Sequence, residues 1–237
     1  MIRKIKNLGL ICAKKNSSEL KNKNLKKIGK HSLFEITCLD FSQSKLVDRV
    51  MVSTDSLKII NLSKQYKFTY PFIRPKKLSQ KSSPEWLVWQ HTLNKFKDIF
   101  GHLPKALVVC SCTAPLRDPK IIDLAIKKFH KLKKDAIISV CKTNFHPAFN
   151  MVKLSKDSNS VQLFLKDKPV FNRQQTSDIF TITTNIYVLK PEFVLKNDHL
   201  FSSKNVGYVE ISKLSSLDID DNFDYLLAKK NFDEKYS

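Results

Sequence analysis

The chain has 237 residues, of which 42% are hydrophobic and 27% are charged, and its formal net charge is +20. The length suits one large α/β domain, and the hydrophobic share excludes a disordered chain. The cationic excess favours anionic partners such as phosphorylated compounds. It is spread along the chain instead of being gathered in one block, which argues against a nucleic-acid-binding protein.

Cysteine usage and hydropathy exclude two further classes. The five cysteines are an odd number without C-x-x-C spacing, which argues against a disulfide framework and a zinc site and favours a reducing cytoplasm. No apolar run approaches the length of a membrane span. The basic residues 1–6 and the short apolar run 8–13 resemble a signal peptide, but a buried first strand fits this short run better.

In the first half of the chain, apolar runs predict strands at 8–13, 49–53 and 106–110. A polar, lysine-rich loop is expected up to about residue 30, and helices at 33–42 and 56–65. Ser83 and Pro84 suggest the cap and first turn of a helix with a stripe at Trp86, Trp89, Leu93 and Phe96.

In the second half, Asp118 and Pro119 predict another helix start, and 136–141 another buried strand. Beyond Pro147 the pattern loosens, with short strands expected at 151–154 and 161–165. Further strands are predicted at 181–189 and 207–211, and a closing helix at 222–230.

The alternation of strands and helices predicts a three-layer α/β/α, Rossmann-like fold with a mostly parallel sheet. Residues 1–237 are expected to form one domain, with about 147–180 as a small irregular insertion. Ligands of such sheets bind at the carboxyl ends of strands. The loops after Ala13, Ser53 and Cys110 are therefore the expected site, and Arg117 is expected to tie down the last of them.

Two sets of residues suggest phosphate chemistry. The loop after Ala13 carries four lysines, among them Lys14 and Lys23, which can supply point charges to a triphosphate or form a solvated loop. Asp218 and Asp220 alternate by two, so an extended segment places both carboxylates on one face. Such a pair suits Mg²⁺, although acidic residues before Asn222 would also suit a helix start.

A family resemblance rests on six segments in order. Residues 13–24, with Ala13, Ser17, Leu20, Lys23 and Asn24, resemble the motif A-R-x-x-S-K-x-[LI]-x-x-K-N of the acylneuraminate cytidylyltransferases, which make CMP-sialic or CMP-legionaminic acid. Residues 52–55 (VSTD), 74–79 with 88–91, 113–117 (TAPLR), 173–174 (RQ) and 216–224 continue the match.

The resemblance implies the fold of nucleotide-diphospho-sugar transferases, a homodimer in which the section around 147–180 reaches across, and transfer of CMP from CTP to a nine-carbon sugar acid with release of pyrophosphate. It implies catalytic roles for Lys14 and Lys23, and for Asp218 and Asp220 as Mg²⁺ ligands. Nucleotide contacts are implied for Ala13, Lys14, Ser17, Lys23 and Asn24, and sugar-acid contacts for Arg173 and Gln174.

The chain departs from the family in the same regions. The loop arginine is Lys14 here, the next basic position is Ser18, and the following glycine is Glu19. Lys81 stands where an aspartate is usual, and the N-G-A-I-Y strand reads TTNIY at 183–187. Two alternatives therefore stay open: transfer to the eight-carbon acid Kdo, and a nucleotide-binding member that has lost catalysis.

Overall fold

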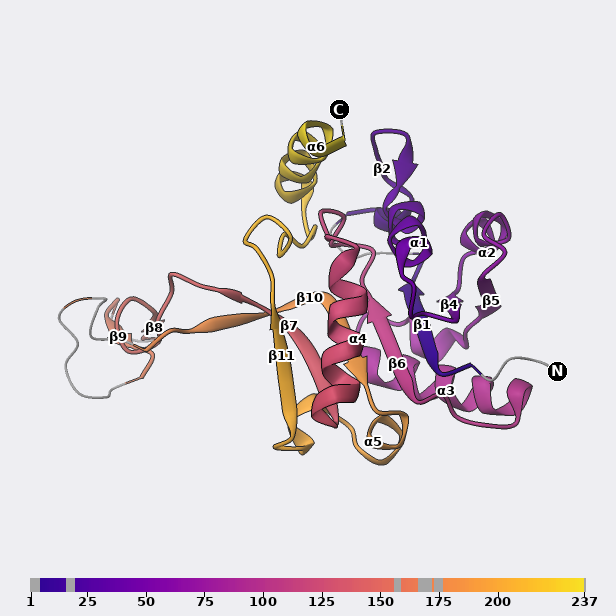
Figure 1. The fold of residues 1–237 in the computed structure, drawn as a ribbon. Coiled ribbons are helices and arrows are strands. Elements are labelled where there is room, and N and C mark those ends of the chain that lie inside the picture. Colours follow the sequence, from indigo (N-terminus) through magenta and orange to yellow (C-terminus); the bar gives the residue numbers. More distant parts are fainter. Residues whose placement is uncertain (1–4, 16–19, 156–158, 166–171, 173–176, 237) are drawn as a thin grey trace.

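A seven-stranded sheet forms the centre of the computed structural model, which describes residues 5–15, 20–155, 159–165, 172 and 177–236 (Figure 1). The strand order is β11-β7-β10-β6-β1-β4-β5. Only β10 runs antiparallel to its neighbours in this sheet, so the predicted mostly parallel sheet is confirmed. The strands are β1 (Asn7–Ala13), β4 (Arg49–Thr54), β5 (Thr69–Ile73), β6 (Ala106–Cys110), β7 (Ala136–Lys142), β10 (Phe180–Leu189) and β11 (Val206–Glu210).

Helices cover both faces of the sheet, which gives the predicted three layers. Their ranges are α1 (Leu33–Gln43), α2 (Leu57–Ser63), α3 (Glu85–Phe100), α4 (Lys120–Leu132), α5 (Pro191–Lys196) and α6 (Asn222–Tyr236), with short 3₁₀ turns η1 (Lys23–Leu25), η2 (Lys76–Ser79) and η4 (Leu200–Ser202). Helix α1 begins with a capping box in which Ser32 and Glu35 exchange hydrogen bonds.

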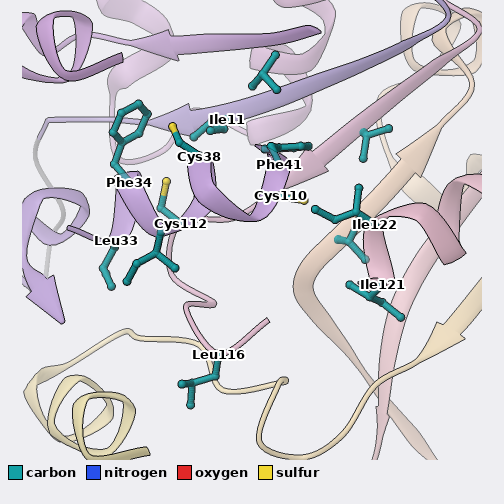
Figure 2. Close-up of a cluster of buried hydrophobic side chains, with 14 of the residues drawn as sticks. Ile11, Leu33, Phe34, Cys38, Phe41, Cys110, Cys112, Leu116, Ile121 and Ile122 are labelled. Atoms are coloured by element: carbon teal, nitrogen blue, oxygen red, sulfur yellow. The ribbon is translucent and has the colours of Figure 1, made fainter. Parts of the chain in front are cut away.

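Strand alternation divides the core in two. In β1, Leu8 and Leu10 enter the cluster under α3 and α5, whereas Ile11 and Ala13 enter the cluster under α1 and α4. Figure 2 shows this second cluster, in which Phe34, Cys38 and Phe41 of α1 lie among side chains of the neighbouring strands. Because successive residues of a strand point to opposite faces, each buried strand supports both layers.

Several predicted boundaries were wrong. Helix α3 begins at Glu85, and Ser83 does not cap it: the Ser83 hydroxyl donates to the carbonyl oxygen of Lys77. Helix α4 begins at Lys120, where the Asp118 carboxylate accepts the Lys120 N–H. In both places proline precedes the first helical residue. Strand β5 and helix α5, together with the ribbon β2 (Lys27–Ile28) and β3 (His31–Ser32), were not predicted.

Strands β8 (Val152–Leu154) and β9 (Val161–Leu163) pair as an antiparallel hairpin that projects from the body of the domain (Figure 1). Its apolar side chains are exposed: Leu154 is 78% and Val161 60% accessible. The hairpin lies within the irregular section expected at about 147–180. Among the described residues, no helix is both long and apolar enough to cross a membrane.

Candidate active site

A cleft of about 430 Å³ lies where β1, β5 and β6 end. This is the edge at which parallel α/β sheets bind ligands. Its volume lies within the range of small-molecule sites. One end of the cleft carries Lys14, Lys23, Asn24 and Asp220, and its wall includes Ser111 and Thr113, which follow β6. The structure thus brings together most of the residues that sequence reasoning assigned to the nucleotide.

The loop after β1 is held by the strand next to it. The carboxylate of Asp55, in the VSTD segment, accepts the Lys15 N–H at 2.6 Å, and the Thr54 hydroxyl donates to the Ala13 carbonyl oxygen at 2.5 Å. Asn24 donates from its amide to the Lys14 carbonyl oxygen at 3.0 Å. Ala13 itself is buried in the core. Asn24 and Ala13 therefore shape the loop on which Lys14 stands.

The Lys23 side chain links the loop after β1 to the segment that precedes α6. Its ammonium donates to the Ile219 carbonyl oxygen at 2.5 Å and to Asp220 Oδ1 at 3.1 Å. The Lys23 side chain is only 12% exposed, whereas that of Asp220 is 67% exposed. The carboxylate of Asp220 therefore faces the cleft with one oxygen held by a cation and the side chain open to a ligand.

One carboxylate oxygen of Asp218 accepts a hydrogen bond, and the other has no hydrogen-bond partner. Its Oδ2 accepts from the Thr184 hydroxyl at 3.0 Å, while its buried Oδ1 has no hydrogen-bond partner. A buried acceptor that stays unpaired is costly, and a carboxylate oxygen of this kind is what a hard divalent cation takes as a ligand. The residues therefore fit an Mg²⁺ ion. Within the described ranges, no group of three or more His, Cys, Asp or Glu residues could enclose one.

The alternative role expected for Asp218 and Asp220, capping the start of the closing helix, is performed by two other acidic residues. Asp221 Oδ1 accepts the Asp224 N–H at 2.9 Å, and Asp224 Oδ2 accepts the N–H groups of Asp220 and Asp221. This reciprocal arrangement caps α6. Because Asp221 and Asp224 perform the capping, the carboxylates of Asp218 and Asp220 are left for another role.

A second cavity of about 560 Å³ includes Asp218, two residues before Asp220 of the first cleft. It lies where β7 ends and β10 begins, and it is lined by apolar and polar side chains from these strands and from the segment that precedes Asp218. These residues include Lys142, Thr143, Asn144, Thr181, Thr183, Thr184, Lys213 and Ser216. The segment 218–220 therefore contributes to both cavities, with Asp218 in one and Asp220 in the other.

The lining of the cleft also includes two residues to which sequence reasoning gave no role. Arg74 is buried and donates from Nε to the Ser79 hydroxyl, and Glu85 is at the start of α3. Glu85 is exposed as a residue, but desolvation of its carboxyl group raises the pKa of Glu85, and interactions with Cys12 and Trp89, together with the nearby Arg74, oppose the rise. The R-P-x-x-L segment was the only signal for Arg74.

Cysteine chemistry is excluded from the cleft. Burial raises the pKa of Cys110 and Cys112 to about 12 and places that of Cys12, which lines the cleft, well above its usual value. These side chains are therefore neutral thiols near pH 7 and not nucleophiles. All five cysteines are free.

Three predicted site residues lie outside the described residues. They are Ser17 in the first loop, and Arg173 and Gln174 in the section assigned to the sugar acid. Their predicted roles are untested.

A profile of cytidylyltransferases matches residues 8–226. The chain belongs to the cytidylyltransferase family. It is thus a nucleotidyltransferase.

Named relatives of this cytidylyltransferase cover nearly its whole length. It is 26% identical over 230 residues to the CMP-N,N'-diacetyllegionaminic acid synthase of Campylobacter jejuni, covering 95% of this chain and 96% of the relative. The N-acylneuraminate cytidylyltransferase of Escherichia coli is 26% identical over 222 residues, which are 93% of this chain and 51% of that longer protein.

Solved structures share the fold at lower identity. A CMP:2-keto-3-deoxy-manno-octonic acid synthetase complexed with CTP superposes with a TM-score of 0.71 at 11% identity, covering 97% of this chain and 99% of that one. The 4-diphosphocytidyl-2C-methyl-D-erythritol synthase of Anaerococcus prevotii gives a TM-score of 0.68 at 13% identity, covering 97% and 96%. At these identities the likeness concerns the fold.

Proposed function

We propose that this cytidylyltransferase transfers CMP from CTP to a sialic-acid-like nine-carbon sugar acid, such as a legionaminic acid, and releases pyrophosphate. The observation that carries the proposal is that one short segment contributes Asp220 to the first cleft and Asp218 to the second cavity. One cavity suits a nucleoside triphosphate and the other a polar acceptor. The relatives named for CMP-legionaminic and CMP-sialic acids support the choice of acceptor.

The triphosphate is assigned to the cationic end of the first cleft. Lys14 and Lys23 line this end, and an ammonium is a compact charge that suits phosphate oxygens. Lys14 therefore keeps the positive charge of the family's arginine, although it offers no planar fork. Ser17 and Asn24 complete the proposed nucleotide set, with Asn24 acting through the Lys14 carbonyl oxygen.

The cytosine is assigned to the part of the same cleft beside Arg74 and Glu85. A carboxylate accepts from the exocyclic amino group of cytosine, which uracil lacks. The carbonyl oxygen that uracil presents at that position would instead meet the Glu85 carboxylate. Glu85 is thus the residue that we expect to favour CTP over UTP.

Asp218 and Asp220 are the residues that would hold an Mg²⁺ ion. When bound, the ion neutralises charge on the phosphates and orients them. The Lys23 ammonium holds Asp220, and the Thr184 hydroxyl holds Asp218. Both carboxylates are therefore placed before the substrates arrive, which is how such sites gain rate.

In the proposed reaction, the anomeric hydroxyl oxygen of the sugar acid forms a bond to the α-phosphorus of CTP. The bond from that phosphorus to the bridging oxygen breaks, and pyrophosphate leaves with the electron pair while the hydroxyl proton is released. Lys14 and Lys23 stabilise the charge that grows on the leaving group. Positioning and charge neutralisation are the main sources of rate in such a transfer.

The acceptor is assigned to the second cavity. Lys213 offers a cation to the sugar carboxylate, and Thr143, Asn144 and Ser216 offer hydrogen bonds to hydroxyl and amide groups. Arg173 and Gln174 remain proposed carboxylate contacts, because an arginine fork suits bidentate binding. The cavity thus offers a cation and several hydrogen-bonding side chains to a sugar acid.

A homodimer is part of the proposal. The hairpin β8–β9 exposes Val152, Leu154, Val161 and Leu163, and apolar side chains gathered on a projecting segment are typical of a contact surface. We propose that residues of about 147–180 reach a second copy. The cytoplasm is the proposed location, because five free thiols suit a reducing compartment.

The test is pyrophosphate release from CTP and Mg²⁺ with N-acetylneuraminate, legionaminate, pseudaminate and Kdo as separate acceptors. We expect release with one nine-carbon acid. Release with Kdo alone would move the assignment to a CMP-Kdo-type synthetase. CTP binding without release for any acceptor would support a member that has lost catalysis.

A further inference from the structure

Arg117 is a charged residue at the centre of the domain. Its side chain is 0% exposed, and it forms an ion pair at 2.7 Å with Asp40 of α1, whose side chain is 3% exposed. Its Nη2 also donates to the Ser111 carbonyl oxygen at 2.6 Å. Its Nε donates to the carbonyl oxygen of Asn185 at 3.0 Å and to Asn185 Oδ1 at 3.2 Å.

Stability is a weak explanation for this arrangement. The desolvation of two buried charges offsets most of their attraction, and apolar replacements of similar volume often serve as well. An arginine fork differs from an apolar side chain in one respect: it fixes the directions of several partners at once. Here the partners belong to α1, to the loop after β6 and to β10.

The β10 partner lies in an irregular part of that strand. Ile182 pairs with Val140 and Tyr187 pairs with Ile138, so residues 183–186 stand against a single residue of β7. The hydroxyl of that residue, Ser139, accepts the Ile186 N–H and donates to carbonyl oxygens of the bulge. Bulges of this kind redirect side chains near active sites.

The redirected side chains hold the segment that carries the two aspartates. Thr184 donates to Asp218 Oδ2 at 3.0 Å, and the Asn185 amide donates to the Ser215 carbonyl oxygen at 2.7 Å. The loop after β6 holds the same segment from the other side, because the Thr113 carbonyl oxygen accepts the Ile219 N–H at 2.8 Å. Arg117 is hydrogen-bonded to both supporting elements: to β10 through Asn185, and to the loop after β6 through Ser111.

We propose that Arg117 is a positioning residue for the divalent-cation site: it fixes the β10 bulge and the loop after β6, and these fix Asp218 and Asp220. The inference rests on the metal assignment of the proposed function. Arg117 acts on the two carboxylates through Asn185, Thr184 and Thr113. Its loss therefore weakens cation binding more than it weakens the binding of CTP without metal.

The experiment measures Mn²⁺ binding to the protein–CTP complex by the electron paramagnetic resonance signal of free Mn²⁺. CTP affinity in EDTA and thermal melting are measured beside it. Three variants are compared. Arg117→Lys keeps the positive charge opposite Asp40 but loses the planar guanidinium fork. The double variant Arg117→Met with Asp40→Leu removes the ion pair as a unit. Asn185→Ala removes the side chain that links Arg117 to the segment carrying the aspartates. Ser63→Ala, a buried hydroxyl on α2 that bonds the Ile60 carbonyl oxygen, is the control.

All three variants are expected to weaken Mn²⁺ binding by about 10-fold or more, as is usual when the partners of metal ligands are removed. CTP affinity in EDTA is expected to change by less than about 2-fold, and Ser63→Ala is expected to leave both constants unchanged. Wild-type Mn²⁺ affinity in a folded double variant would overturn the proposal and leave Arg117 a stabilising residue. If the double variant does not fold, wild-type affinity in Asn185→Ala overturns it.

The outcomes separate this inference from the proposed function. Absence of pyrophosphate release with every sugar acid would contradict the proposed function, yet a selective loss of Mn²⁺ affinity in the variants would still support the positioning role. Absence of Mn²⁺ binding to the wild-type complex would overturn the positioning role directly.

Discussion

The two cavities of this cytidylyltransferase are built in different ways. The nucleotide cleft lies on the ends of parallel strands, and hydrogen bonds between distant segments, such as Lys15 with Asp55 and Lys23 with Asp220, hold its walls. The acceptor cavity lies at the start of antiparallel β10, on the side of the sheet from which the exposed hairpin projects (Figure 1). The cleft proposed for CTP is fixed by the sheet, whereas the cavity proposed for the acceptor lies in segments that can vary without disturbing it.

The largest expected loss of activity comes from a substitution at Asp220, in the segment that contributes to both cavities. Asp220→Asn should lower kcat/KM by about 10³-fold or more, because charge stabilisation by a bound metal is worth several kcal/mol and each 1.36 kcal/mol is tenfold in rate. Asp221→Asn is the matched control, since asparagine also caps helices well. Pyrophosphate release measures both, and equal losses would show that the Asp220 carboxylate has no special role.

The next effect tests the cationic end of the nucleotide cleft. Lys23→Met should raise the KM for CTP by about 10-fold to 100-fold, because a hydrogen bond to a charged group contributes about 1.5–3 kcal/mol. Lys21, an exposed lysine of the same loop, provides the control Lys21→Met. If both variants raised KM alike, the general positive field of the loop would explain CTP binding.

A smaller effect concerns selection of the base. Glu85→Gln should lower the preference for CTP over UTP by about 10-fold, since one base contact contributes about 1–3 kcal/mol of discrimination. The ratio of kcat/KM for the two nucleotides measures it. Glu192→Gln, which changes an exposed carboxylate on α5, should leave the ratio unchanged. An unchanged ratio in Glu85→Gln would place the base elsewhere.

The smallest effect on the nucleotide cleft comes from the hairpin. Leu163→Lys should weaken self-association by about 10-fold or more, because a charge on an apolar contact surface stays unpaired, while CTP affinity should change by less than about 2-fold. Analytical ultracentrifugation and calorimetry measure the two quantities. Leu57→Lys changes an equally apolar, exposed residue of α2 and should leave association intact. A change in both variants, or in neither, would remove the hairpin from the proposed interface.

Much of the sheet could be predicted because buried parallel strands are continuous apolar runs, as in 106–110. Strand β5 was missed because it is an edge strand that contains Pro71, and proline in an apolar run argues against a strand. The α3 and α4 boundaries were misplaced by one residue, because capping chemistry alone does not reveal where a proline-led turn first becomes helical.

The site was predictable only where residues are close in sequence or follow a strand. The roles predicted for Lys14, Lys23 and Asp220 await the tests above, but the structure does place all three in one cleft. Arg74 and Glu85 reach that cleft from β5 and α3, which depends on tertiary packing. The pairing of Asn185 with Arg117 depends on a bulge whose register is set by the opposite strand, and no local pattern in the sequence shows it.

The bond between Lys23 and Asp220 spans 197 residues of sequence. A chain emerging from the ribosome at about 5–20 residues per second therefore completes the first sheet strands many seconds before the acidic half of the proposed site exists. Contacts of such long range also form late when a whole chain refolds, because the entropy of closing the loop must be overcome first. The cleft proposed for CTP is thus among the last parts of the fold to assemble, and its Lys23 and Asp220 meet only when the fold is nearly complete.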